Sequence, residues 1–450
     1  RLRSSTSWTV EASATVTEPV RRELRAAYRA RRLRARRLRA LAGLVGLAVV
    51  VWVVLVVVLP GGGAVPTARG GTPDPGHGTA KAPRLAITAT VPGVLEVSGS
   101  LGDLPFPKSG QGAVGVAGVG IIGASPHEIS RPIASVTKVM TAFLVLRDHP
   151  LTAAGGGPVL TMTKADHLAW IKASEEDESN VRIVAGERID ERQLLEALLI
   201  PSADNVADIL ARWDAGSIVA FAQKMNAEAA LLGLGHTRYG DASGVNPLSR
   251  STAANQVVLA AQVMANPVFR SIVDMRSAVI PVAGRVWNYN PVLGQDGIVG
   301  VKSGFTQEAE GCLVTAAWRT VSGHRVLVVS AATGQTLGLY EAGRVDVALL
   351  DAATGLLAER TVLGAGDVVG VARDRLTGKT AKLVLSGGGI VVTGWPGLGL
   401  RTRLRALPRA QIPARALAAG TIVATLRVTA PSGSAIVEPV VLARELPASR

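Results

Sequence analysis

The 450-residue sequence contains a single cysteine, Cys312, and only six histidines. One cysteine excludes an intrachain disulfide, and a chain without disulfides fits either side of a cell membrane, so the count does not fix the compartment. The histidines are scattered and lack the spacing of metal ligands. We therefore predict no metal site. The sequence also has no internal repeat, which leaves domains with separate cores as the expected organisation for this length.

Acidic residues are scarce at the N-terminal end. Residues 1–40 contain 12 Arg against Glu11, Glu18 and Glu23, a net charge of 12 − 3 = +9, so the other residues carry 14 − 9 = +5. The basic character of the chain is therefore local. Such a run could bind nucleic acid, but an apolar segment follows it directly. We therefore predict a basic cytoplasmic tail and no nucleic-acid partner.

Charged residues are absent from Leu41–Leu59, an apolar run of 19 residues. This length is enough for a helix to cross a bilayer, whereas a secretory signal has a shorter apolar core. The arginines before it predict a cytoplasmic N-terminus, with everything after Leu59 outside the cell. A buried helix of a soluble protein is the alternative. Residues 60–85, rich in Gly and Pro without apolar periodicity, are predicted to be a flexible linker.

Residues 86–358 combine strand-like runs at both ends with helical patterns in the middle. Asp190 and Gln193 have the form of a capping box at the start of one helix. This order predicts an α+β domain, with one antiparallel sheet built from both ends of the segment beside a helical subdomain. The expected strands are Val114–Ile122, Ile298–Val301, Cys312–Trp318 and Val326–Ala332, and the expected closing helix is Glu341–Leu357.

Two further stretches have a distinct composition. Residues 362–446 alternate short β-type runs with Gly and Pro turns, which predicts a small all-β domain. Ser174–Asn180 is acidic. A paired-carboxylate site is conceivable there, but a solvated loop is the favoured interpretation.

A serine and a lysine three residues apart open the most informative stretch. Ser135 begins an apolar run and Lys138 follows it. On a helix the two side chains lie on one face, so the Lys138 amine could remove the proton of the Ser135 hydroxyl. Because Ser-x-x-Lys is common by chance, an ordinary helix start is the favoured interpretation of this motif alone.

Two later motifs make a catalytic pair, rather than an ordinary helix start, the favoured interpretation of Ser135 and Lys138. Ser202 lies at a junction between helices and is followed by Ala203, Asp204 and Asn205. Lys302-Ser303-Gly304-Phe305-Thr306 falls on an expected edge strand, where a cation and a hydroxyl could bind a carboxylate and the glycine would admit a substrate backbone. Taken separately, a helix cap and an exposed strand lysine explain these residues equally well.

The three motifs in this order resemble those of the low-molecular-mass penicillin-binding proteins, the serine D-Ala-D-Ala carboxypeptidases. Ile133–Ala142, Asp241–Gly244 and Lys302–Thr306 carry the resemblance, which extends over roughly Leu104–Leu357. It implies the penicillin-binding/β-lactamase-like transpeptidase fold and no cofactor. It also implies an extracytoplasmic bacterial enzyme, held in the cell membrane, that acts on peptidoglycan stem peptides ending in D-Ala-D-Ala and is acylated by β-lactam antibiotics.

The resemblance also implies roles. Ser135 would attack the substrate carbonyl and form an acyl-enzyme, Lys138 would take the serine proton, and Ser202 would relay a proton to the leaving D-alanine. Backbone N–H groups of Ser135 and Phe305 would form an oxyanion hole. Substrate contacts are expected from Asp204, Asn205, Lys302, Ser303, Gly304 and Phe305.

Asp204 departs from the family pattern, which has Asn at that place, while Asn205 comes one position late. A carboxylate only accepts hydrogen bonds and favours the charged form of Lys138, which would weaken it as a base. Two alternatives therefore stay open. One is a serine β-lactamase, for which Glu191 and Glu196 show no match to the required deacylating Glu. The other is a cell-wall-binding homologue with weakened catalysis.

Overall fold

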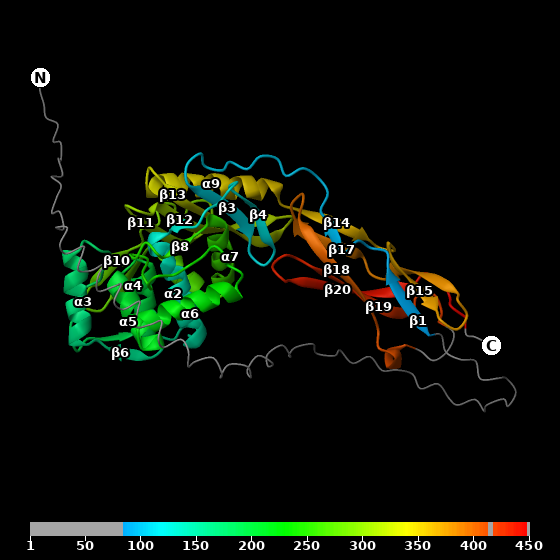
Figure 1. The fold of residues 1–450 in the computed structure, drawn as a ribbon, viewed down its shortest axis with the longest axis horizontal. Helices are drawn as coiled ribbons and strands as arrows, with labels where there is room; N and C mark the ends of the chain where they lie inside the picture. The colour runs from blue at the N-terminus through cyan, green and yellow to red at the C-terminus, as the bar shows by residue number, and fades with distance from the viewer. Residues whose placement is uncertain (1–83, 413–416, 448–450) are drawn as a thin grey trace, which may run out of the picture. The chain divides into compact units, whose positions relative to one another are not determined.

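The computed structural model describes residues 84–412 and 417–447 (Figure 1). The expected tail and membrane segment, and nearly all of the expected linker, lie outside these residues. Among the described residues, no single helix is long and apolar enough to cross a membrane.

A five-stranded antiparallel sheet forms the centre of the first domain, in the order β11-β12-β13-β3-β4. Its strands are β3 (Gln111–Val116), β4 (Gly120–Ala124), β11 (Ile298–Thr306), β12 (Glu310–Val321) and β13 (His324–Gln335). Two strands come from the beginning of the domain and three from its end, which confirms the predicted α+β arrangement. The third motif lies on β11, an edge strand, so one side of its backbone is open to a ligand.

The prediction of one strand over Val114–Ile122 is wrong, because the chain turns back between Val116 and Gly120. The N–H of Val119 donates to the carbonyl of Val116 at 3.0 Å, and Gly118 takes φ +75° in this turn. Both arms of the hairpin are apolar and no polar residue marks the turn. The hydrophobic pattern therefore looked continuous.

Helices cover both faces of this sheet (Figure 1). Alternate strand residues point to opposite faces: Ala113 packs in one apolar cluster with Val257 of α7, and Val114 in another with Leu349 of α9. The predicted capping box is confirmed, because Asp190 and Gln193 each accept from the other's backbone N–H. The helices are η1 (Ala134–Thr137, a 3-10 turn), α2 (Lys138–Asp148), α3 (Lys164–Glu175), α4 (Glu191–Leu199), α5 (Asp204–Ala215), α6 (Ile218–Leu231), α7 (Ala253–Val263), α8 (Pro267–Val273) and α9 (Leu339–Leu356).

Three short strand pairs connect these helices. They are β5 (Arg131–Pro132) with β8 (Arg250–Ser251), β6 (Val159–Thr161) with β7 (Arg188–Asp190), and β9 (Ser277–Ile280) with β10 (Gly284–Trp287).

A seven-stranded sheet forms the second domain, in the order β1-β15-β16-β20-β19-β18-β2. Its strands are β1 (Leu85–Ala89), β2 (Val94–Glu96), β15 (Val368–Asp374), β16 (Thr380–Leu385), β18 (Gly399–Ala406), β19 (Ile422–Thr429) and β20 (Ala435–Leu442), beside the pair β14 (Ala358–Gly364) and β17 (Gly389–Gly394) and the short turn η2 (Arg409–Gln411).

The expected boundary at residue 86 needs correction, because β1 and β2 pair with strands of the second domain. Leu85 lies opposite Asp374, and Leu95 lies opposite Leu400. These partners are about 300 residues away in sequence. A strand of three to five residues carries no local signal of such a distant partner.

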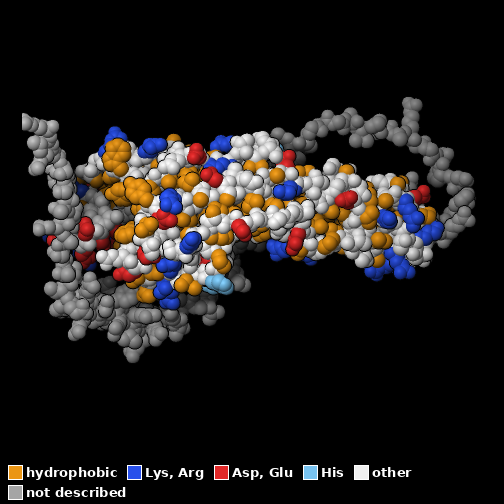
Figure 2. All heavy atoms as spheres, turned by 90° about the horizontal axis from the view of Figure 1, so that it is seen from above, with side chains coloured by type: hydrophobic (Ala, Val, Ile, Leu, Met, Phe, Trp, Pro, Cys, Tyr) orange, Lys and Arg blue, Asp and Glu red, His pale blue; other side chains and the backbone are white. Residues whose placement is uncertain are grey.

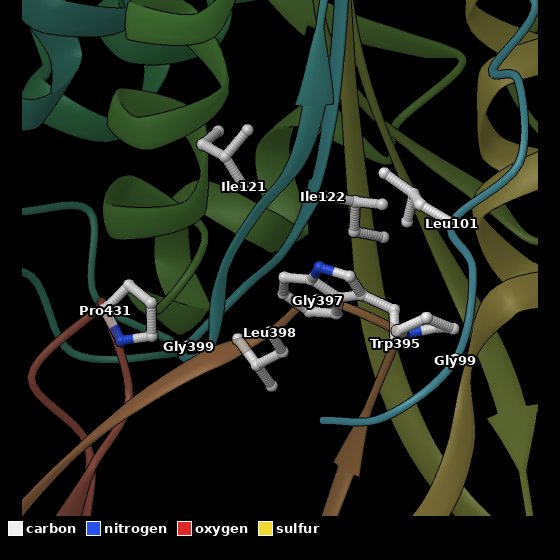
Figure 3. Close-up of a pocket in the computed structure, with 10 residues that line it drawn as sticks. Gly99, Leu101, Ile121, Ile122, Trp395, Gly397, Leu398, Gly399 and Pro431 are labelled. Atoms are coloured by element: carbon white, nitrogen blue, oxygen red, sulfur yellow. The ribbon is translucent and has the colours of Figure 1, made fainter. Parts of the chain in front are cut away.

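Between the two sheets lies an apolar recess of about 370 Å³ (Figure 3). Ile121 and Ile122 of β4 line it from one side, and Trp395 and Leu398 line it from the second domain. Near it, the Ser432 hydroxyl donates to the carbonyl of Gly118 at 2.7 Å. None of the residues that line the recess belongs to the three motifs.

Candidate active site

Ser135 lies on the short turn η1, directly before α2. The residue before it, Ala134, has φ +46°, which is uncommon for a residue other than Gly and costs free energy. The neighbouring loop packs against this turn so closely that a Cβ at Gly244 would lie 1.9 Å from the Ala134 carbonyl oxygen. Gly244 is therefore required for the approach that supports the turn, and Ser135 is held in a half-exposed position.

Lys138 is fully buried and its amine donates three hydrogen bonds. The acceptors are Ser135 Oγ at 2.7 Å, Asp204 Oδ1 at 2.5 Å and the carbonyl of Ser243 at 2.9 Å. Three acceptors match the three N–H groups of an ammonium. The geometry thus describes a charged Lys138 that already contacts the Ser135 hydroxyl. It must release a proton before it can act as a base.

The loop Asp241–Gly244 provides one of these acceptors. The Asp241 carboxylate accepts hydrogen bonds from the Ser243 hydroxyl at 2.8 Å and the Gly244 N–H at 3.0 Å. The Thr141 hydroxyl donates to the carbonyl of Ala242 at 2.6 Å and fixes the loop against α2. The sequence marked this loop through the resemblance but gave it no role. Its contribution is a backbone carbonyl, which has no signature in the residue types.

Asp204 begins α5 and its side chain turns to the site. It is 6% exposed and contacts Lys138, its partner 66 residues away. Burial raises the pKa of the Asp204 carboxyl above its ordinary value, and the Lys138 ammonium opposes that rise. We take the carboxylate as the form in contact with Lys138, because a 2.5 Å contact with an ammonium favours the charged form.

Asn205 does not reach Lys138, contrary to the expectation of a substrate contact there. Its amide donates to the carbonyl of Val181 at 2.9 Å, and its oxygen accepts from the Val181 N–H at 3.2 Å. On a helix, consecutive side chains point about 100° apart. One of the two residues can therefore face the site, and the structure assigns that position to Asp204.

Ser202 lies just before α5 in an unusual conformation. Its φ is +65°, it is 3% exposed, and its hydroxyl has no hydrogen-bond partner among the described residues. A buried hydroxyl without a partner costs free energy, and such groups concentrate at functional sites. Strained backbone, such as the positive φ of Ser202, also costs free energy and concentrates at functional sites. This unpaired hydroxyl is available to a ligand.

The third motif lies on β11, and the backbone of this strand packs against η1. A Cβ at Gly304 would lie 2.9 Å from the Ser135 nitrogen, so a larger residue would push the strand away. Lys302 is 2% exposed and donates to the Ser303 carbonyl at 2.8 Å. Burial, together with the positive charge of Lys138, holds the pKa of Lys302 well below its usual range. Phe305 is 57% exposed, so its side chain lies at the protein surface.

The acidic stretch Ser174–Asn180 is not simply a solvated loop. Its first two residues complete α3, and the carbonyl of Ser179 then accepts from the Asp204 N–H at 2.6 Å. Glu178 is half-buried, and burial reinforced by the Asp204 charge raises the pKa of Glu178 to about 7. Composition marked this stretch as acidic, but only the contact with α5 places it beside the site.

These residues together form a site suited to nucleophilic attack on a carbonyl. A half-exposed hydroxyl contacts a buried amine, a second hydroxyl has no hydrogen-bond partner in the described part of the chain, and a buried lysine lies on an edge strand of the sheet. The arrangement can form an ester on Ser135 and can hold an anionic group near Lys302.

The comparisons with known proteins point to one family. Residues 117–333 match the family model described as D-alanyl-D-alanine carboxypeptidase. The chain is 29% identical over 263 residues to a D-alanyl-D-alanine carboxypeptidase of Streptomyces strain K15, which covers 52% of this chain and 88% of that protein. It is 31% identical over 217 residues to one of Mycobacterium tuberculosis, covering 47% of this chain and 69% of that protein.

The fold agrees with these sequence comparisons. A mutant of the DD-transpeptidase from Streptomyces strain K15 superposes with a TM-score of 0.50 at 26% identity. The superposition covers 56% of this chain and all of that one. The family match ends at residue 333, so it does not include strands β14 to β20 of the second domain.

Proposed function

Because the chain belongs to the D-alanyl-D-alanine carboxypeptidase family of serine peptidases, we propose that it removes the terminal D-alanine from peptidoglycan stem peptides through an acyl-enzyme on Ser135. The family confirms the predicted enzyme class, a serine-type hydrolase. The observation that supports the mechanism most directly is the 2.7 Å contact between the buried Lys138 amine and the Ser135 hydroxyl.

Acylation needs a neutral Lys138. Once its ammonium has released a proton, the amine can accept the proton of Ser135 as Oγ bonds to the carbonyl carbon of the penultimate D-alanine. The carbonyl electrons move to oxygen, where N–H groups of Ser135 and Phe305 can stabilise the charge. The C–N bond then breaks, and the Ser202 hydroxyl relays a proton to the departing amine. The lack of a hydrogen-bond partner for this hydroxyl among the described residues supports that role.

Lys302 supplies the cation that the terminal carboxylate of such a substrate requires. Its pKa is depressed in the free protein, so an arriving carboxylate favours the charged form and gains a charge-assisted hydrogen bond. The acyl-enzyme is released when water attacks the ester carbon, which regenerates Ser135 and yields the shortened peptide. An amine in place of water would give a transpeptidation product instead.

We also propose that Leu41–Leu59 crosses the bacterial membrane once, with residues 1–40 in the cytoplasm and the two domains outside. The Arg run before this segment and its apolar length support the topology. Protease added to intact spheroplasts should digest the chain after Pro60 and spare residues 1–40. The reverse pattern would reject this topology.

Labelled penicillin tests the nucleophile. The full chain in detergent should give one acylated peptide containing Ser135, and Ser135→Ala should remove the label. Ser217→Ala, at an exposed serine that caps α6 in the same domain, is a control that should keep it. Label that persists in Ser135→Ala would refute the assignment.

A cell-wall-binding protein with weakened catalysis is the second candidate, favoured by the 2.5 Å contact of Asp204 with Lys138. Release of D-alanine from a synthetic peptide ending in D-Ala-D-Ala, measured beside nitrocefin hydrolysis, separates the candidates. The carboxypeptidase should release D-alanine and turn over nitrocefin only slowly. A β-lactamase would show the opposite ratio, and the weakened homologue would turn over neither.

A further inference from the structure

One face of the seven-stranded sheet carries cations on four of its inner strands, β15, β16, β18 and β19. On β18, Arg401, Arg403 and Arg405 alternate with residues such as Leu400, which is 2% exposed. Because side chains of a strand alternate between faces, the three arginines point away from the core on one face.

The strand register extends this face across the sheet. Arg403 lies directly opposite Arg427 on β19, and Arg427 lies opposite Val437 on β20. On β20, Val441 lies on the same side as Val437, and it pairs with Val384 on β16. Lys382 is two residues from Val384 on β16, so it lies on this side too. Val371 on β15 pairs with Lys382, which places Arg373, two residues further along β15, on this side as well. The basic face is defined by Arg373, Lys382, Arg401, Arg403, Arg405 and Arg427.

Few acidic residues lie close enough to the basic face to neutralise its positive charge. Among the described residues, none of its six cations makes an ion pair. Glu96 lies on the same side, but at the edge of the sheet opposite Gly399. Glu438 pairs with the buried Leu426 and so points to the opposite side. In Figure 2, Lys and Arg side chains gather at the end of the molecule where Figure 1 places β1 and β15.

The cations of the basic face spread in two dimensions. Residues two apart on β18 are separated by about 7 Å, and the four strand spacings from β18 to β15 span about 19 Å. Val94 and Val437, each 51% exposed, lie among them as apolar contacts. A broad field of this kind fits a charged surface better than it fits a single linear chain.

The position of β1 ties the basic face to the proposed membrane segment. The described chain begins at Arg84, directly before β1 in this same sheet. Residues 60–84, 25 in number, separate β1 from the apolar run, so the chain itself tethers this sheet to that run. The basic face is thus confined near a bilayer if Leu41–Leu59 spans it.

We propose that the basic face docks on a bilayer surface with anionic phosphate headgroups. This inference rests on the membrane anchoring proposed above. The cations are attracted to the negative surface within about a Debye length, and the two exposed valines contact the interface between headgroups and acyl chains. The face then provides a second, salt-sensitive contact in addition to the apolar segment.

A fluorophore on the basic face tests this docking. Thr425, opposite Arg405 on this face, can be replaced by Cys and labelled; Cys312 is buried, with its pKa raised to about 12, and should not react. The full-length Thr425→Cys chain is reconstituted in phosphatidylcholine vesicles, with and without phosphatidylglycerol, that contain a headgroup-linked quencher. We expect quenching several-fold stronger in the anionic vesicles, and loss of that difference at high salt.

Two four-site variants provide the matched comparison. Replacing Arg401, Arg403, Arg405 and Arg427 with Gln should abolish the difference between the vesicles. Replacing four exposed cations of the first domain with Gln removes the same charge from another surface and should preserve the difference. Those control positions are Lys108, Lys164, Arg188 and Arg344. Penicillin acylation should be unchanged in both variants and reports that the first domain is folded.

Flotation with the neutral vesicles reports the anchor separately. Failure to float there, with flotation and quenching retained in the anionic vesicles, would refute the apolar anchor and support the docking face. Flotation with equal quenching in both vesicle types would overturn the docking alone. Linear polyphosphate that binds the basic face without any quenching by anionic vesicles would also overturn it, and would assign the face to a polyanionic polymer.

Discussion

The candidate site and the basic face use positive charge in opposite ways. Lys138 and Lys302 are buried, and Lys138 has an anionic partner at 2.5 Å. The cations of the basic face are surface residues without ion pairs among the described residues. A buried charge must be paired or neutralised, so its neighbours set its protonation. An exposed charge keeps its protonation and acts at a distance, where salt screens it.

This contrast predicts the largest effect for removal of a buried cation. Lys138→Met should slow penicillin acylation by about 10²- to 10⁴-fold, because the proposed mechanism uses the Lys138 amine as the base for Ser135. It also leaves Asp204 buried without a partner, which should lower the free energy of unfolding by about 3–5 kcal/mol. Acylation kinetics and urea unfolding measure the two effects.

The double variant Lys138→Met/Asp204→Asn is the control for that experiment. It should regain most of the lost stability because the unpaired carboxylate is gone, but acylation should stay slow. Acylation by Lys138→Met at a rate close to that of the original chain would assign the base to another group.

Asp204→Asn should change the pH dependence rather than abolish the reaction. Asp204→Asn removes the buried carboxylate that accepts a hydrogen bond from the Lys138 amine and puts a neutral amide in its place. We therefore expect several-fold faster penicillin acylation near pH 7, with the acid limb of the rate moved to lower pH.

Asn205→Ala is the matched comparison for Asp204→Asn. Its two hydrogen bonds go to Val181, so the substitution should reduce stability by about 1–3 kcal/mol and leave the pH profile in place. A profile that shifts in Asn205→Ala but not in Asp204→Asn would exchange the roles of the two residues.

Glu178→Gln should have a smaller effect, visible in stability against pH. The pKa of Glu178 is raised from 4.5 to about 7 in the folded chain, so folding favours its protonated form. Stability from this group is present below about pH 4.5 and is lost as pH rises toward 7. Between pH 5 and pH 8, the midpoint temperature of thermal unfolding should fall less for Glu178→Gln than for the original chain. Parallel curves would show that Glu178 titrates normally.

The smallest effect is expected on the basic face. Arg403 and Arg427 are like charges directly opposite each other, an unfavourable cross-strand pair. Arg403→Gln should raise the free energy of unfolding by less than about 1 kcal/mol at low salt, and the gain should vanish at high salt. Urea unfolding at two ionic strengths measures this. A loss of stability instead would mean that the Arg403 side chain packs on the sheet.

Much of the fold and the site followed from local patterns in the sequence. Ser135 and Lys138 are one helical turn apart, so their contact depends only on local geometry. The same is true of Asp190, whose capping box closes within four residues. The order of the three motifs also identified the family, because chemistry limits which residue types can occupy those positions.

Tertiary structure decided what depends on distant partners. Lys138 meets Asp204 66 residues away and the carbonyl of Ser243 105 residues away. The sequence left open whether Asp204 or Asn205 faces the site, and it could not give a role to a backbone carbonyl. The pairing of β1 and β2 with strands of the second sheet also depends on residues far away in the sequence, so these short strands could not be assigned to that sheet from local patterns. Local residues therefore determined the contact between Ser135 and Lys138, whereas long-range packing determined the charge beside it.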